Sequence, residues 1–100
     1  VAYGADSRWA DAIAAFERIL ALEPGNALAL QNIAAMHLSR SDLPAAERFA
    51  RQAIDRDPQL AKAHTTLGVV FARSNRRESA IDAWKRAVSL DATEFDALYN

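Results

Sequence analysis

The stretch AIAAFER at residues 12–18 recurs as AIDAWKR at residues 80–86. The two stretches are 68 residues apart. Half of this shift, 34 residues, aligns Pro24 with Pro58 and Asp57 with Asp91, which defines a 34-residue period. It also aligns four pairs of alanines: Ala27 with Ala61, Ala29 with Ala63, Ala46 with Ala80, and Ala53 with Ala87. A fixed period of this length is typical of architectures in which one supersecondary unit stacks on the next. The period therefore predicts a chain of stacked repeats.

Each period carries two helices. Apolar residues three and four positions apart predict a helix from residue 9 to residue 22, with Trp9, Ala12, Ile13, Phe16, Ile19 and Leu20 on one face. The same spacing predicts a second helix that is interrupted near Arg40-Ser41-Asp42 and a third that ends at Asp57-Pro58. It also predicts a fourth helix that closes near Ser74-Asn75 and a fifth that stops around Asp91-Ala92-Thr93. Residues 95–100 predict the first turn of a sixth. Because each connection is only a few residues long, neighbouring helices must lie antiparallel, and we expect an all-α fold.

Local signals mark the helix starts. Asn26 follows Pro24 and is a good cap for the second helix, and Pro44 suits the first turn of the third. Asn75, followed by Glu78, predicts a capping box that opens the fifth helix.

Composition excludes several classes of protein. Twelve basic and 13 acidic residues give a net charge of -1, so no nucleic-acid partner is expected. The lack of cysteine excludes disulfides, thiolate zinc sites and thiol nucleophiles. No apolar run approaches the ~18 to 20 residues of a membrane span, so no membrane insertion is expected. Residues 1–6 lack the features of a secretion signal, the chain does not begin with Met as expected of an excised segment, and the compartment stays open.

The segment Leu67-Gly68-Val69-Val70-Phe71, followed by Ala80, Trp84 and Ala87, resembles the tetratricopeptide repeat, with the pattern W-x-x-L-G-x-x-Y, then A-x-x-x-F-x-x-A, then P. The preceding period has Ile33, Ala34, His37, Ala46, Ala50, Ala53 and Pro58 in the corresponding places. The resemblance implies a right-handed α-solenoid in a single domain over residues 1–100. Its units are a partial repeat at 1–26, full repeats at 27–60 and 61–94, and the start of a further repeat at 95–100. Departures are Leu30 and His64 in the tryptophan slot, Ala34 in the glycine slot, and Ala92 in the third proline slot.

No catalytic constellation is present in the sequence. His37 and His64 fall on the buried stripes of their helices, and an offset of seven positions, about 10 Å of axial rise, is too long for a shared metal. His37 is expected to be a core histidine with its hydrogen bonds satisfied. Since no H-E-x-x-H, phosphate-binding glycine loop or G-x-S-x-G occurs, we expect no enzyme, no metal and no cofactor.

Charged clusters have simple interpretations. Asp55 and Asp57 lie near helix ends, where capping is expected. The cluster Arg73, Arg76 and Arg77 matches a helix end, where cations are favoured by the negative dipole, although an acidic ligand is the alternative. A solvated face is predicted for Glu47, Arg48, Arg51 and Arg56.

In the family that the sequence resembles, the first helices of the repeats line a concave surface that receives a partner's peptide. The resemblance places the following residues on that surface: Leu28, Gln31, Asn32, Ala35, Ser39, Lys62, Thr65, Thr66, Val69 and Arg73. Members that clamp the C-terminal carboxylate of a chaperone have asparagine and lysine in the slots of Asn32 and Lys62. Thr66 stands where that clamp has arginine, so two of its five slots match. The resemblance thus implies a non-catalytic protein–protein interaction module.

Two alternatives stay open at this point. In the first alternative, the repeats are an accessory segment of a larger bacterial enzyme, a transferase or sulfatase, and position its substrate or partner. In the other alternative they self-stack, because incomplete repeats leave apolar ends that favour a homo-oligomer. The short terminal turn at 95–100 must dock on the Ile81-Trp84-Val88 face, bind a partner, or fray.

Overall fold

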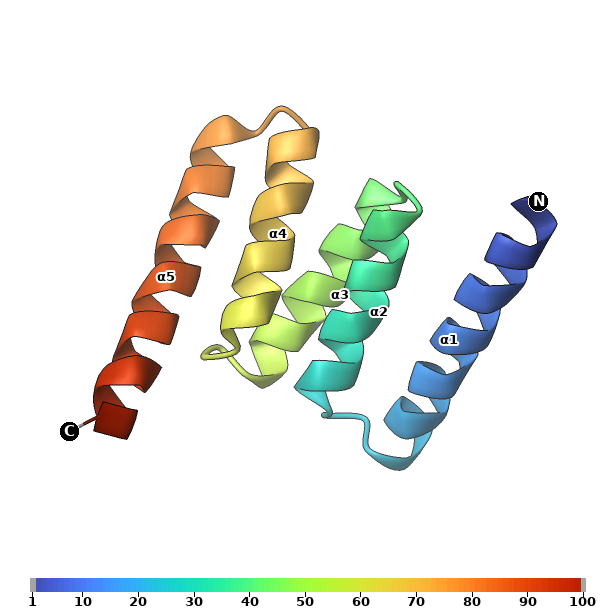
Figure 1. Ribbon diagram of the computed structural model, residues 1–100, viewed down its shortest axis with the longest axis horizontal. Coiled ribbons are helices and arrows are strands. Elements are labelled where there is room, and N and C mark those ends of the chain that lie inside the picture. Colours follow the sequence, from blue (N-terminus) through green and yellow to red (C-terminus); the bar gives the residue numbers. More distant parts are fainter. Residues whose placement is uncertain (1, 100) are drawn as a thin grey trace.

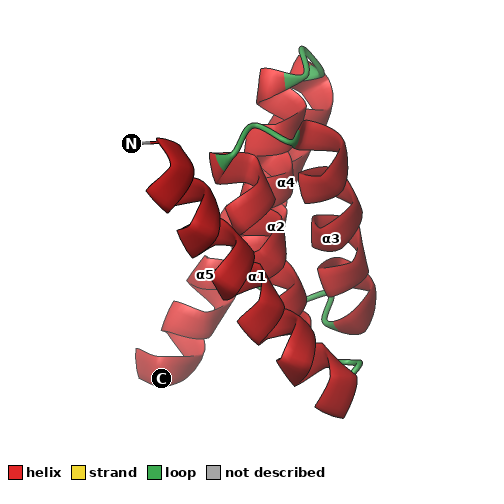
Figure 2. Cartoon of the chain, turned by 90° about the vertical axis from the view of Figure 1, so that its right-hand side faces the viewer, coloured by secondary structure: helices red, strands yellow, loops and turns green. Residues whose placement is uncertain are grey.

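Five helices, each antiparallel to the next, form the part of the chain that the computed structural model describes, which is the backbone of residues 2–99 and the side chains of residues 10–91 (Figure 1). They are α1 (Ala2–Leu22), α2 (Ala27–Ser39), α3 (Leu43–Arg56), α4 (Ala61–Arg73) and α5 (Arg77–Tyr99). α2 packs along α3, and α4 along α5, while α3 packs on α4 and α1 on α2. α2 and α4 also touch, with α3 to one side of them (Figure 2). The predicted antiparallel helix pairs are thereby confirmed.

The starts of α2 and α3 follow the local sequence. The Asn26 side-chain oxygen accepts a hydrogen bond from the Ala29 backbone N–H at 3.0 Å. The Asp42 carboxylate accepts from the Ala45 N–H at 3.3 Å, and Pro44 lies in the first turn of α3. Each bond satisfies a backbone donor that has no partner inside the helix. Asn26 and Pro44 therefore act as predicted.

The ends of α2 and α4 are built alike, at positions one 34-residue period apart. Ser41 and Asn75 have left-handed backbone, with φ of 64° and 63°. The next N–H in each case reaches back to the helix, from Asp42 to the His37 carbonyl at 2.9 Å and from Arg76 to the Phe71 carbonyl at 2.8 Å. This is the Schellman arrangement, which satisfies the last carbonyls of a helix.

The predicted capping box at Asn75 and Glu78 is wrong. Asn75 terminates α4, and the first backbone bond of α5 runs from the Ala80 N–H to the Arg76 carbonyl at 3.0 Å. The physical reason is the left-handed φ of Asn75, which places this residue outside the start of α5. Arg76 thus occupies the capping position.

The predicted end of the fifth helix is also wrong. α5 runs without a break through Asp91, Ala92 and Thr93 to Tyr99, so no separate sixth helix begins at residue 95. At the position of Pro24 and Pro58 the third period has Ala92, which keeps its N–H and favours helix. Residues 95–99 therefore extend along α5 and do not fold back onto the Ile81-Trp84-Val88 face. α1 likewise begins at Ala2 rather than near Trp9.

Small residues let the helices of a pair approach closely. Ala34 and Ala50 are fully buried between α2 and α3, in a cluster that continues through Leu67 and Phe71 of α4 to Ala80 and Ala83 of α5. In the next pair, a Cβ on Gly68 would lie 2.3 Å from Nε1 of Trp84. That separation is far below van der Waals contact, so the Trp84 ring occupies the space that the absent Gly68 side chain leaves free.

Candidate functional site

The predicted concave-face residues lie on α2 and α4, two helices that are in contact (Figure 1). Their accessibility differs. Leu28, Ser39, Lys62, Thr65 and Arg73 are exposed, and Asn32, Ala35 and Val69 are half-buried. Gln31 and Thr66 are only 6% and 8% exposed. The two helices therefore present eight of the ten predicted side chains to solvent and withdraw two.

Leu28 and Lys62 line a groove of about 840 Å³ at the N-terminal ends of α2 and α4. The remaining walls come from the α3–α4 connection, the first residue of α4 and the middle of α5: Asp57, Gln59, Leu60, Ala61, Arg86, Ser89, Leu90 and Asp91. The other eight predicted residues are not among those that line it. The groove thus combines leucine side chains with charges of both signs, and α5 contributes a wall that the sequence did not predict.

Arg73 makes contacts within the fold. Its guanidinium donates to the Leu38 backbone carbonyl at 3.1 Å and to the Ser41 hydroxyl at 2.8 Å. A cation at the C-terminal end of a helix satisfies free carbonyls and the helix dipole. The sequence favoured a helix-end role for Arg73, and the structure assigns its contacts to the end of the neighbouring helix α2 rather than to its own.

The two histidines have different surroundings. The His37 ring stacks on Phe49 with 5.5 Å between centroids, so it packs as a core aromatic, as predicted. Its buried Nδ1, however, has no hydrogen-bond partner among the described residues, and the Asp42 carboxylate is 3.9 Å away. The prediction of a fully satisfied histidine is wrong for His37, because the ring is held by stacking. His64 Nε2 donates to the Pro58 carbonyl at 2.9 Å, since a carbonyl oxygen only accepts.

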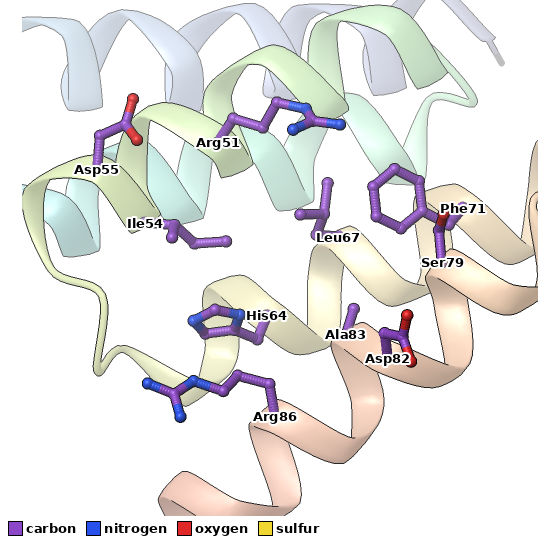
Figure 3. Close-up of a pocket in the computed structure, with 10 residues that line it drawn as sticks. All are labelled: Arg51, Ile54, Asp55, His64, Leu67, Phe71, Ser79, Asp82, Ala83 and Arg86. Atoms are coloured by element: carbon purple, nitrogen blue, oxygen red, sulfur yellow. The ribbon is translucent and has the colours of Figure 1, made fainter.

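A second groove, of about 540 Å³, lies between α3 and α5 with α4 as its floor (Figure 3). Arg51 and Asp55 project from the α3 wall, and Asp82 and Arg86 from the α5 wall, while His64, Leu67 and Phe71 lie between them. Its other lining residues are Ile54, Ser79 and Ala83. No sequence motif predicted this groove, although His64, a smaller side chain in a slot that the family fills with tryptophan, is consistent with unfilled space there.

Glu47 joins α3 to the turn before α5. Its carboxylate accepts a hydrogen bond from Arg51 Nε at 2.9 Å and another from the Arg76 guanidinium. The hydrogen bond from Arg76, and then that from Arg51, lowers the pKa of the Glu47 carboxyl, against the opposing effect of partial burial. The Arg76 and Arg51 guanidinium carbons also lie 4.5 Å and 5.6 Å from the Phe71 ring centroid. The predicted solvated face is therefore wrong for Glu47, which is half-buried and bonded to Arg76, whereas Arg51 remains exposed as predicted.

The described residues form neither a metal-binding cluster nor a membrane-spanning helix. No three histidine, aspartate or glutamate side chains in that part of the chain gather as ligands for a metal ion. None of the helices described combines the length and apolar character needed to cross a bilayer.

No family model matches the chain, and no curated protein matches it. Solved structures do. The crystal structure of MamA has a TM-score of 0.77 at 20% identity and covers 84% of this chain, which spans about half (49%) of that protein's chain. The second TPR of Spaghetti (RPAP3), bound to the HSP90 peptide SRMEEVD, has a TM-score of 0.79 at 24% identity, over 89% of this chain and 82% of that one. The TPR2B domain of yeast Sti1, in a complex with pHsp70, has a TM-score of 0.80 at 25% identity, over 97% and 84%.

These neighbours share one architecture. The chain has the fold of the tetratricopeptide-repeat family, and the predicted all-α solenoid with a 34-residue period is confirmed.

Proposed function

We propose that this domain is a non-catalytic protein–protein interaction module that binds a partner peptide along α2 and α4. The observation that carries the proposal is the groove at the start of these helices, where Leu28 and Lys62 lie together. Supporting it, two solved domains of the same fold are an RPAP3 domain bound to an HSP90 peptide and a Sti1 domain in a complex with pHsp70. Peptide recognition needs only positioned side chains and no reacting groups.

The groove favours a peptide with one apolar anchor and charges on either side. Leu28, Leu60 and Leu90 supply the apolar surface, and Lys62 lies on the same groove as Asp91. A buried apolar contact within a polar rim is the usual anatomy of a binding hot spot. A carboxylate clamp is less well matched, because Thr66, in the slot of the clamp's arginine, is uncharged and only 8% exposed.

The test is a peptide-display selection on the whole chain, followed by titration of the best peptide by calorimetry. We expect Leu28→Ala combined with Lys62→Ala to weaken binding by about tenfold or more, since truncating hot-spot residues costs upwards of ~1 kcal/mol each. The matched control is Arg48→Ala, an exposed cation on α3 that lines neither groove. Peptides whose affinity is unchanged in the α2–α4 variant would contradict the proposal.

The HSP90 peptide SRMEEVD is a second probe, because it is the ligand in the RPAP3 structure. With two of five clamp slots matched, we expect this chain to bind the free-acid and the C-terminally amidated peptide equally weakly. A clear preference for the free acid would instead show recognition of the carboxylate. No observation on the described residues favours the alternative in which the repeats serve a transferase or sulfatase.

A further inference from the structure

An apolar seam runs along the outer side of α5. Ile81, Trp84 and Val88 are 41%, 39% and 67% exposed. Together with Lys85 and Ser89 they line a shallow hollow of about 420 Å³. Single exposed apolar residues are common on protein surfaces, whereas a continuous apolar patch indicates an interaction surface.

The internal repeat shows what this seam lacks. A shift by one period aligns Trp84 with Ala50 and Val88 with Ile54 of α3. There α4 covers the corresponding face, because Ala50 and Ile54 pack in one cluster with Leu67 and Phe71. On α1 the corresponding Leu20 packs against the cluster around Leu30 of α2. The same face is therefore covered on α1 and α3. On α5 the Trp84 ring packs in part on Gly68 of α4, and no described helix covers Ile81, Val88 or the exposed part of Trp84.

The charges on α5 indicate what covers the seam. Arg77, Ile81, Trp84, Val88 and Asp91 follow one another at spacings of four, three, four and three residues, which is the spacing of a coiled-coil seam. The seam thus begins with a cation and ends with an anion. Neither Arg77 nor Asp91 forms an ion pair with another described residue. Such a line is self-complementary when it meets a reversed copy of itself.

We propose that two copies of the chain pair through this seam, with their α5 helices antiparallel about a two-fold axis at Trp84. In this register Arg77 of each copy lies opposite Asp91 of the other, and Ile81 lies next to Val88 of the other copy. Moving the axis to between Trp84 and Lys85 would instead place Glu78 opposite Asp91, which repels. Glu78 and Lys85, an acidic and a basic residue, lie on α5 one position after Arg77 and Trp84, along the edge of the seam.

The pairing is closed and uses one patch twice, so it gives a dimer and not a filament. It specifies the expected homo-oligomer: the α5 face of one copy meets the α5 face of a second copy. Leu28 and Lys62, which carry the proposed peptide binding, lie outside the seam, although Ser89 and Asp91 belong to both surfaces, so the inference does not depend on peptide binding.

The first test is the mass of the whole chain in sedimentation equilibrium over a range of concentrations. We expect a reversible monomer–dimer equilibrium, and loss of the dimer in Val88→Asp, whose side chain is exposed and whose helicity should be unchanged by circular dichroism. Ser79→Asp places the same charge on the side of α5 that lines the α3 groove and should dimerise normally. A chain that is monomeric at millimolar concentration, or a dimer that survives Val88→Asp, would overturn the proposal.

The second test fixes the register by charge reversal. Arg77→Asp and Asp91→Arg should each weaken the homodimer by about tenfold, because like charges then face each other. Mixing the two variants should restore pairing as a heterodimer in native mass spectrometry, and the double variant Arg77→Asp/Asp91→Arg should again form a homodimer. Asp82→Arg is the matched control on the opposite side of α5. Failure of the mixture to form a heterodimer would overturn the antiparallel register.

Discussion

Gly68 and Trp84 illustrate how one residue determines another across a helix pair. In the preceding repeat the corresponding residues are Ala34 and Ala50, both completely buried, so that pair closes on two small side chains. In the last repeat a glycine on α4 faces a tryptophan on α5, with the indole nitrogen where a Cβ would lie. In the first contact two alanines fill the space between the helices, and in the second a tryptophan fills it opposite a glycine. A degenerate repeat can thus change its residues and keep its packing.

This contact predicts that Gly68→Ala destabilises the domain. In an isolated helix the substitution would be favourable by ~1 kcal/mol. Here the added methyl group would lie 2.3 Å and 2.4 Å from two atoms of the Trp84 ring, so we expect a net loss of about 1 to 3 kcal/mol in the free energy of unfolding. Urea denaturation measures it. The control is Gly68→Ala on a Trp84→Leu background, where the penalty should shrink or change sign; an equal penalty in both would contradict the explanation.

The Glu47 carboxylate predicts a dependence of stability on pH. Its pKa lies below the ordinary value of 4.5, chiefly because Arg76 donates a hydrogen bond to the charged form. A lowered pKa in the folded state stabilises the fold above the unfolded-state value, and this contribution is lost as the pH falls below 4.5 through the lowered pKa. Glu47→Gln should therefore lose less stability than the native chain over that acid range. Glu17→Gln, at an exposed position on α1, is the control and should follow the native curve.

At the scale of the elements, the helix ends define the repeat as much as the helix interiors do. Pro24 and Pro58 follow the ends of α1 and α3, and left-handed Ser41 and Asn75 follow the ends of α2 and α4. Where the proline is replaced by Ala92, α5 continues to Tyr99. The length of each helix is thus decided by a single residue at its end.

The left-handed residue after α4 gives a prediction at this scale. Asn75→Ala should destabilise the domain by about 1 kcal/mol, because a Cβ disfavours left-handed backbone and asparagine tolerates it better than alanine. Asn75→Gly should be neutral or stabilising, since glycine adopts this conformation without steric cost. Thermal unfolding followed by circular dichroism measures both. Asn32→Ala, inside α2, is the comparison and should not destabilise; equal losses at both sites would exclude the left-handed conformation as the cause.

Over the whole molecule, the contact between α2 and α4 sets the position of the proposed peptide surface. Arg73 reaches from the end of α4 to Leu38 and Ser41 at the end of α2. Arg76 similarly reaches Glu47 of the preceding repeat. These polar bonds supplement the apolar core and fix how one helix pair is placed on the next.

We therefore expect Arg73→Ala to lower the free energy of unfolding by about 1 kcal/mol, as for the loss of typical hydrogen bonds. Asn32→Ala combined with Lys62→Ala should change it by less than ~0.5 kcal/mol, as for surface substitutions generally. Chemical denaturation and peptide titration on the same variants separate the two roles. If Arg73→Ala left stability unchanged and reduced peptide binding alone, Arg73 would belong to the peptide surface.

Helix type, most boundaries and antiparallel pairing could be predicted from the sequence. Each of these depends on local signals: the spacing of apolar residues, prolines at a fixed period, and side chains such as Asn26 that bond three residues ahead. The peptide face on α2 and α4 was predicted from the resemblance to the tetratricopeptide repeat and not from these signals. The local signals did not predict the end of α5 correctly, because the expected stop at residues 91–93 lacks the proline that stops the earlier helices.

The tertiary structure alone decided which of these residues are accessible and which polar groups meet. Gln31 and Thr66 occupy predicted surface positions, yet neighbouring helices bury them. Arg73 and Ser41 are 32 residues apart in sequence, and Arg76 and Glu47 are 29 apart, so no local pattern specifies either pair. The groove around His64 likewise needs three helices at once. These features depend on how one repeat is rotated onto the next, and that rotation is set by the packing of side chains from separate repeats rather than by any single helix.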